Sequence, residues 1–180
     1  MKTRLLLAGA AAVLLSACAT PRNKPMKGIH MAATPAKAGQ HMTVRTTAYT
    51  HTEAGGSKNG IGGRLRFKSS VRSAAADWSW MPLGTRFCLS SDTTQQYVIE
   101  DYGSALVGRQ TIDMYMPNMR MVREWGVKHV EIEILEWGSK PMSLKLLQGR
   151  MRKDHVREMV ASLKKQGVRP LAMNTSVTSG

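Results

Sequence analysis

The stretch 100–117 limits most strongly what this chain can fold into. It reads as the end of one strand, a loop with two glycines, and a second strand over 111–116. Because successive side chains of an extended chain point to opposite faces, the second strand has an apolar and a polar face. Ile112, Met114 and Met116 form the first face, whereas Thr111, Asp113 and Tyr115 form the second. With the apolar face as the core, Asp113 stands on the opposite surface, and Asp101 lies within reach across the loop.

The neighbouring segments predict further short strands. Alternating and β-branched residues, bounded by glycines, prolines or polar turns, mark six strand segments. They are 42–50, 71–77, 86–90, 95–101, 111–116 and 127–136. Asn118 opens a short helix that closes at Gly126. So many short strands with one short helix are typical of a small barrel or sandwich. We therefore predict a mainly β domain over residues 44–137.

The net charge of +14 would suggest a nucleic-acid partner if it belonged to the folded domain. Residues 1–43 carry +6 and residues 138–180 carry +7, which leaves only +1 for residues 44–137. A domain that bound phosphates itself would carry the charge on its own surface. We therefore expect no nucleic-acid partner.

The N-terminus has the parts of a bacterial lipoprotein signal in the right order. Two basic residues precede an apolar run over 5–15, and the box Leu15-Ser16-Ala17-Cys18 follows. The run is too short to span a bilayer but suits a secretory signal. We predict that residues 1–17 are a signal peptide and that Cys18 is lipidated; a plain signal peptide with an incidental cysteine is the alternative. Ala19, where an Asp would retain the protein, favours anchoring in the outer membrane, facing the periplasm.

Residues 18–43 are predicted to form a flexible tether. They contain three prolines among Lys, Ala and Gly, and almost no aromatic residues. With Cys18 acylated, Cys88 has no partner for an intramolecular disulfide. The apolar neighbours Phe87 and Leu89 favour a Cys88 that packs as a small hydrophobic residue rather than acting as a nucleophile.

Residues 138–180 form a basic C-terminal extension with a helix predicted at 151–166. An apolar stripe runs along this helix, surrounded by Lys and Arg. The stripe consists of Val156, Met159, Val160 and Leu163. Packing of the stripe on the barrel is one interpretation, and contact with anionic lipid or wall polymer is the other.

Five short motifs then suggest a family. They are Thr47-Ala48-Tyr49-Thr50, Asp77 ahead of Pro82-Leu83-Gly84-Thr85, Asp101 opening a Gly-rich loop, Ile112-Asp113-Met114-Tyr115, and Trp125-Gly126-Val127. Together they resemble the bacterial 3D domain, named for three aspartates that here are Asp77, Asp101 and Asp113. The resemblance covers about residues 44–137 and implies a six-stranded double-psi β-barrel. Such domains occur in membrane-bound lytic transglycosylase A and in wall-remodelling proteins of Gram-positive bacteria.

The resemblance implies cleavage of peptidoglycan between N-acetylmuramic acid and N-acetylglucosamine. By that likeness, Asp113 protonates the glycosidic oxygen and then assists attack by the muramoyl 6-hydroxyl, which leaves a 1,6-anhydro end. Asp101 holds substrate or tunes the proton affinity of Asp113, and Asp77 completes the catalytic set in a positioning or structural role. Neither a cofactor nor a metal is implied.

General acid catalysis also sets a physical requirement on Asp113. The acid must hold a proton near neutral pH, whereas a free Asp has a pKa of about 3.9. Burial or a neighbouring carboxylate raises that pKa, and Asp101 is expected to supply such an effect. Because the nucleophile is the substrate's own hydroxyl, one acid is sufficient. The alternative is an Asp113 that only binds turn amides.

Four aromatic residues near the acids are candidate platforms for sugar rings, namely Tyr102, Tyr115, Trp78 and Trp80. Packing in the core or at the rim is the alternative for each. His51 and Glu53 lack metal-ligand spacing and are interpreted as surface residues. The loop departs from the family pattern, because Val107 stands where a lysine is common, although Arg109 offers a cation nearby.

The sequence therefore predicts a lipid-anchored envelope protein that acts on peptidoglycan glycan strands. The first hypothesis is a lytic transglycosylase or, failing that, a glycoside hydrolase that acts on the same bond. A non-catalytic, expansin-like wall-binding lipoprotein is the alternative.

Overall fold

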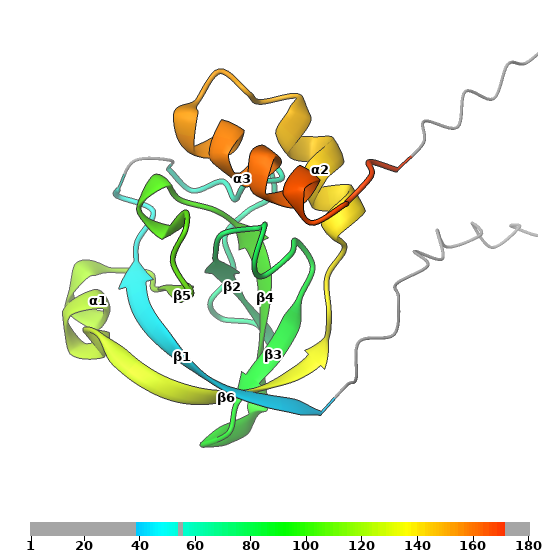
Figure 1. Cartoon of the computed structure of the whole chain (residues 1–180). Coiled ribbons are helices and arrows are strands. Elements are labelled where there is room, and N and C mark those ends of the chain that lie inside the picture. The colour runs from blue at the N-terminus through cyan, green and yellow to red at the C-terminus, as the bar shows by residue number, and fades with distance from the viewer. Residues whose placement is uncertain (1–38, 54–55, 172–180) are drawn as a thin grey trace, which may run out of the picture. The chain divides into compact units, whose positions relative to one another are not determined.

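Six strands close into a barrel in the order β1-β5-β2-β4-β3-β6 (Figure 1). The computed structural model describes residues 39–53 and 56–171. The strands are β1 (Gln40–Tyr49), β2 (Val71–Ala75), β3 (Arg86–Leu89), β4 (Asp92–Asp101), β5 (Thr111–Tyr115) and β6 (Lys128–Glu136). β1 pairs with β5 and β2 with β4 in parallel, and the other pairs are antiparallel. The mainly β prediction is confirmed as a closed barrel, and the double-psi connectivity stays a prediction.

The alternation predicted for 111–116 is present in β5. Ile112 and Met114 are fully buried and Met116 nearly so, and all three belong to the main hydrophobic core. The inner faces of the other strands complete this core with Val44, Ala74, Phe87, Ile99, Ile132 and Ile134. Cys88 is buried as well, in keeping with its predicted packing role. Asp113 is thereby on the outer face of the barrel.

The short helix α1 (Met119–Trp125) begins and ends as the sequence predicts. The Asn118 side chain accepts a hydrogen bond from the Met121 amide at 3.0 Å, which satisfies one free donor of the first turn. Gly126 ends the helix with a positive φ of 62°. A shorter 3₁₀ turn, η1 (Ser104–Leu106), lies in the Gly-rich loop.

The C-terminal extension holds two helices, where the sequence predicted one. α3 (Asp154–Lys165) lies within the predicted span 151–166, and α2 (Lys140–Gln148) was missed. A proline usually argues against a helix, and Pro141 therefore hides the sequence signal of α2. Proline is nevertheless tolerated in a first helical turn, because the amide there has no helical partner. The Ser139 side chain caps this turn by accepting from the Met142 amide at 3.1 Å.

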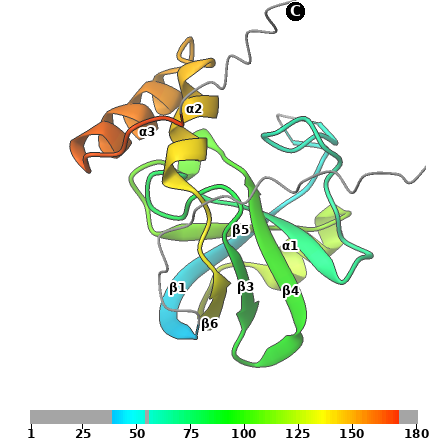
Figure 2. The same cartoon turned by 90° about the vertical axis from the view of Figure 1, so that its right-hand side faces the viewer.

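Both helices pack on one end of the barrel (Figures 1 and 2). The apolar stripe of α3 is completely buried and shares one core with Leu144 and Leu147 of α2 and with Trp78, Met81 and Leu83 of the barrel loops. The packing interpretation of the stripe is therefore correct, and the stripe is not free to contact lipid. No helix in the described ranges combines the length and the apolar character that crossing a bilayer requires.

The junction between barrel and helices is fixed by main-chain contacts. The Ser139 amide donates to the Leu83 carbonyl at 3.0 Å, and the Ser143 hydroxyl accepts from the Leu83 amide at 3.0 Å. At Gly138 a Cβ atom would lie 2.3 Å from the Leu83 carbonyl oxygen and 2.5 Å from that of Pro82. Only glycine permits this approach, so the helical pair is held in one position on the barrel.

Candidate active site

Four residues form a row across adjacent strands on the outer face of the barrel. Thr47 of β1 is in register with Asp113 of β5, and Asp113 is in register with Ala75 of β2. Ala75 in turn is in register with Asp101 of β4. Residues in register point to the same face of a sheet. The two acids therefore flank a residue whose side chain is a single methyl group, which leaves open space between them.

Asp101 reaches this face because of a β-bulge. Ala74 pairs with Ile99 and Ala75 pairs with Asp101, so Glu100 is an extra residue in β4. Without the bulge, Asp101 would share the inward face of Ile99, because side chains two apart on a strand point the same way. Bulges of this kind re-aim side chains next to functional sites. Here the bulge brings Asp101 onto the side of Asp113.

Glu100 itself is buried, and neighbouring side chains bind its carboxylate. Its carboxylate accepts from the Ser73 hydroxyl and forms an ion pair with Arg66. These contacts tie the segment before β2 to β4 and hold the bulge in place. Since both carboxylate oxygens of Glu100 have partners, we assign it a structural role.

A pocket of about 610 Å³, here called the acid pocket, opens above Asp101 and Asp113. Its walls come from the end of β1, the loop 56–62, the Gly-rich loop after β4 and the turn that follows α2. Beside the two aspartates it is lined by Tyr49, Glu53, Lys58, Gly60, Ala75, Tyr102, Ser104 and Arg150, among others. These walls combine charged and hydroxyl side chains with apolar surface, a combination that suits a sugar, whose hydroxyls need polar partners.

Asp113 has the environment of a proton donor. Burial raises its pKa from 3.8 to about 6, and the negative charge of Glu53 acts in the same direction. The Thr47 hydroxyl donates to its Oδ1 at 2.7 Å and, like the positive charge of Arg45, lowers the pKa in part. The charge of Asp101 is a minor cause. The expected mutual effect of the two acids is thus small, because Ala75 separates them, and burial is the main cause.

Asp101 is held by two hydrogen bonds. The Tyr49 hydroxyl donates to its Oδ2 at 3.1 Å, and the Tyr102 amide donates to its Oδ1 at 2.9 Å. Burial raises the pKa of Asp101, and these hydrogen bonds oppose the rise. Burial next to Asp101 also raises the pKa of the Tyr49 phenol well above its ordinary value, so Tyr49 is a hydrogen-bond donor at this site.

Asp77 does not join the other two aspartates. It is only 3% exposed and accepts from two amides, that of Ser79 at 2.8 Å and that of Gly108 at 2.9 Å. These bonds shape the turn after β2 and fix the Gly-rich loop. Asp77 lines a second pocket of about 420 Å³ on the other side of that loop. These contacts fit the structural role that the sequence analysis allowed for Asp77, and they separate Asp77 from the acid pocket.

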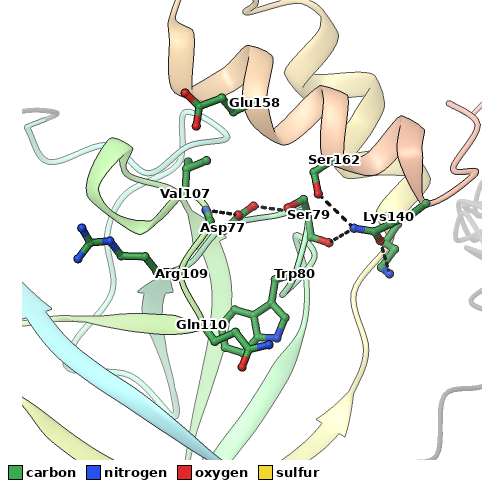
Figure 3. A pocket seen from close by; sticks show the side chains of 11 residues that line it. Asp77, Ser79, Trp80, Val107, Arg109, Gln110, Lys140, Glu158 and Ser162 are labelled. Carbon is green, nitrogen blue, oxygen red and sulfur yellow. Dashed lines mark hydrogen bonds between the residues drawn. The ribbon is translucent and has the colours of Figure 1, made fainter.

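Figure 3 shows this second pocket between the loops of the barrel and the helices α2 and α3. Trp80 and Gln110 lie on one side of it and Glu158 on the other, with Arg109 and Lys140 at opposite ends. Gln166 ties helix α3 to the barrel here, because its side-chain amide donates to the Ser79 carbonyl at 3.1 Å.

The four aromatic candidates are divided among different places. Trp78 is 0% exposed and its indole donates to the Asp101 carbonyl at 2.9 Å, so its prediction as a sugar platform is wrong. Trp80 is half-buried in the second pocket, away from the acids. Tyr115 is 8% exposed, stacks edge-on with Tyr49, and shares a hydrogen bond with His51 at 3.2 Å. Only Tyr102 lines the acid pocket.

Several residues in or beside the acid pocket were given no role by the sequence analysis. Thr47 and Tyr49 were noted as part of a motif without a role, and Glu53 was interpreted as an ordinary surface residue. Arg150 lies in the C-terminal extension, far from the acids in sequence, and carries no local signal. Arg109, expected near the acids, instead lines the second pocket. Within the described ranges, His, Cys, Asp and Glu side chains do not gather into a group that could hold a metal ion.

The comparison with known families follows this geometry. Residues 72–136 match the family model of the 3D domain. The chain carries a 3D domain. The matched segment runs from β2 to the end of β6 and contains all three aspartates of the motif. Tyr49 and Arg150 lie outside the matched segment, one on each side, and both line the acid pocket. Thr47, which donates to Asp113, also lies outside it. No curated protein matches the chain.

Proposed function

We propose that the chain is a lipid-anchored envelope protein whose 3D domain cleaves peptidoglycan glycan strands by lytic transglycosylase chemistry. One observation carries this proposal. Asp113, with a pKa raised by burial to about 6, lies on strand β5 and lines an open pocket together with a second carboxylate and hydroxyl groups. A carboxyl group of this kind is protonated in part near neutral pH and can act as an acid and then as a base.

In the proposed reaction, protonated Asp113 gives its proton to the oxygen that links N-acetylmuramic acid to N-acetylglucosamine. The bond from C1 of the muramoyl residue to that oxygen breaks, and the N-acetylglucosamine leaves with a free hydroxyl. The muramoyl 6-hydroxyl attacks C1 and passes its proton to the Asp113 carboxylate. The product is a 1,6-anhydro end, the acid is regenerated, and no water is consumed.

Asp101 and Tyr49 would support this chemistry without transferring a proton. The Tyr49 phenol orients one oxygen of Asp101, and the Tyr102 amide orients the other. A carboxylate fixed in this way can accept sugar hydroxyls and stabilise positive charge that develops at C1. Tyr102 at the pocket wall offers a ring edge and a hydroxyl to the glycan.

The location of the protein in the envelope is part of the proposal. The signal peptide 1–17, the lipidated Cys18 and most of the tether 18–43 lie outside the described residues. An acyl anchor at Cys18 would hold the protein in the outer membrane, and the tether 18–43 would connect this anchor to the domain. The acid pocket would then reach glycan strands in the periplasm. Radiolabelled palmitate should be incorporated by the wild type and not by Cys18→Ser.

The decisive experiment is product analysis. Purified protein is incubated with sacculi and with isolated glycan strands, and the ends are identified by mass spectrometry. Wild type should release 1,6-anhydromuramoyl ends, Asp113→Asn should release none, and Asp92→Asn, at the exposed start of β4 away from the pocket, should match wild type. Reducing ends that contain one added water would indicate a hydrolase instead. Binding to sacculi without product would support the non-catalytic wall-binding alternative and overturn the enzymatic proposal.

A further inference from the structure

The C-terminal helices contribute a cation to the acid pocket. Arg150, in the turn between α2 and α3, lines this pocket together with Asp101, Asp113 and Tyr102. Its Nη1 donates to the Gly60 carbonyl and reaches the Tyr102 hydroxyl at 3.4 Å. Arg150 thus connects three parts of the chain at the pocket edge: the helical extension, the loop 56–62 and the loop after β4.

The position of Arg150 is well defined on both sides. On its own side, α2 and α3 are held by the shared core and by the close approach at Gly138. On the other side, the Asn59 side chain fixes the loop by accepting from the Gly63 amide at 2.7 Å. A Cβ on Gly60 would lie 3.0 Å from the Tyr102 ring and 3.2 Å from Asp101 Oδ1, so the loop packs directly against the site. A pre-positioned group binds a ligand at lower entropic cost than a mobile one.

The guanidinium of Arg150 retains unused binding capacity. It is half-buried, and within the described residues it hydrogen-bonds only through Nη1 and forms no ion pair. The cation that lowers the pKa of Asp113 is Arg45, not Arg150. Lys58, exposed on the adjacent loop, is the second cation of the pocket. A planar guanidinium with free donors is suited to two-point binding of a carboxylate, and a nearby ammonium adds attraction.

We propose that Arg150, assisted by Lys58, forms a carboxylate-binding subsite at the edge of the acid pocket, and that it binds the carboxylate carried by muramoyl residues. This inference rests on the proposed function. In the glycan strand, neutral N-acetylglucosamine alternates with muramoyl residues that carry an acidic substituent. A cation at a fixed distance from Asp113 therefore sets the register of the strand, so that one of the two kinds of glycosidic bond meets the acid. The carboxylate is either that of the lactyl ether, free where the peptide is missing, or one at the end of a stem peptide.

The test measures binding in the Asp113→Asn background, so that no ligand is cleaved. Three tetrasaccharides of equal length are titrated by calorimetry: GlcNAc-MurNAc repeats without peptides, the same repeats with stem peptides, and a neutral GlcNAc oligomer. Arg150→Gln should weaken binding of an acidic tetrasaccharide tenfold to a hundredfold, because a hydrogen-bonded charge pair is lost. It should leave binding of the neutral oligomer within about twofold. Loss with the bare repeats identifies the lactyl carboxylate, and loss with the peptide-bearing repeats alone identifies the peptide carboxylate.

Control variants separate a charge effect from a loss of structure. Arg150→Lys keeps the charge without the planar fork and should restore binding in part, whereas Arg109→Gln, in the second pocket, should leave all three affinities unchanged. Equal weakening of the acidic and the neutral ligands by Arg150→Gln, or no weakening at all, would overturn the subsite. Since binding requires no turnover, the charge-selective pattern without 1,6-anhydro products from wild type would reject the catalytic proposal and support the subsite. Release of 1,6-anhydro products by wild type without the charge-selective pattern would support the catalytic proposal and overturn the subsite.

Discussion

The acid pocket and the second pocket flank the same loop after β4, yet Asp113 in the first and Asp77 in the second have different surroundings. Asp77 is nearly inaccessible and accepts from two main-chain amides, so its carboxylate serves as an anchor for a turn and a loop. Asp113 accepts from one hydroxyl and faces an open pocket, and burial raises its pKa. The comparison teaches that a motif aspartate is assigned a chemical role by the donors around it and not by the motif.

The largest expected contrast is in cleavage rate. Asp113→Asn should lower the rate of glycan cleavage by a factor of about 10² to 10⁴, since it removes the proposed general acid and base. Asp77→Asn, corrected for the fraction of folded protein, should lower the rate by less than about tenfold. The measurement is release of 1,6-anhydro ends under initial-rate conditions. Equal losses in the two variants would contradict the separation of roles.

The next contrast is in stability. In Asp77→Asn one carboxylate oxygen is replaced by an NH₂ group, which cannot accept a hydrogen bond. One of the two main-chain amides that donate to Asp77 therefore loses its acceptor and is left buried and unpaired. We expect the free energy of unfolding to fall by about 2–3 kcal/mol, measured by urea denaturation. The same measurement on Asp92→Asn, at the exposed start of β4, should show no comparable loss. A stable Asp77→Asn would remove the structural assignment.

Asp113→Asn should change stability in the opposite direction. Because the folded state raises the pKa of Asp113 from 3.8 to about 6, the folded protein binds more protons between these values, and stability falls as the pH rises. Removing the carboxyl should raise the free energy of unfolding by about 1–3 kcal/mol at pH 8 and change it little at pH 3. A variant that is less stable than wild type at pH 8 would contradict the buried-acid description.

The smallest effect concerns the pH dependence of the rate. Wild-type cleavage should decline as the pH rises above about 6, when Asp113 loses its proton. Thr47→Val removes the hydroxyl that stabilises the ionised carboxylate at 2.7 Å. The midpoint of the decline should then move upward by about half to one pH unit. A midpoint that does not move would show that another group controls the pH profile.

Much of the fold could be predicted from local sequence. The alternation in β5, the cap at Asn118, the stop at Gly126 and the stripe of α3 are each determined by neighbours in the chain. The pairing of Asp101 with Asp113 across one pocket was also foreseen. These features depend on short-range periodicity, which a single sequence records directly.

The remaining features depend on contacts between distant segments. The bulge at Glu100 is a mismatch of register between β2 and β4, which neither strand shows alone. Trp78 and Trp80 look alike in sequence, although one is in the core and the other lines a pocket. Arg150 lines the acid pocket only because Gly138 lets α2 dock on the barrel. Burial and long-range docking of this kind are tertiary properties.

The row of Thr47, Asp113, Ala75 and Asp101 has a consequence for how the protein is made. Its members come from four strands, and two of the three pairings along the row are parallel and join segments far apart in the chain. Such pairings form slowly, because long loops must close before any contact rewards them. Under the proposed function, a newly synthesised or incompletely folded chain would therefore not cleave glycan strands. Barrel closure and the onset of cleavage would be one event, and the protein would need no inhibitor to stay inactive before it folds.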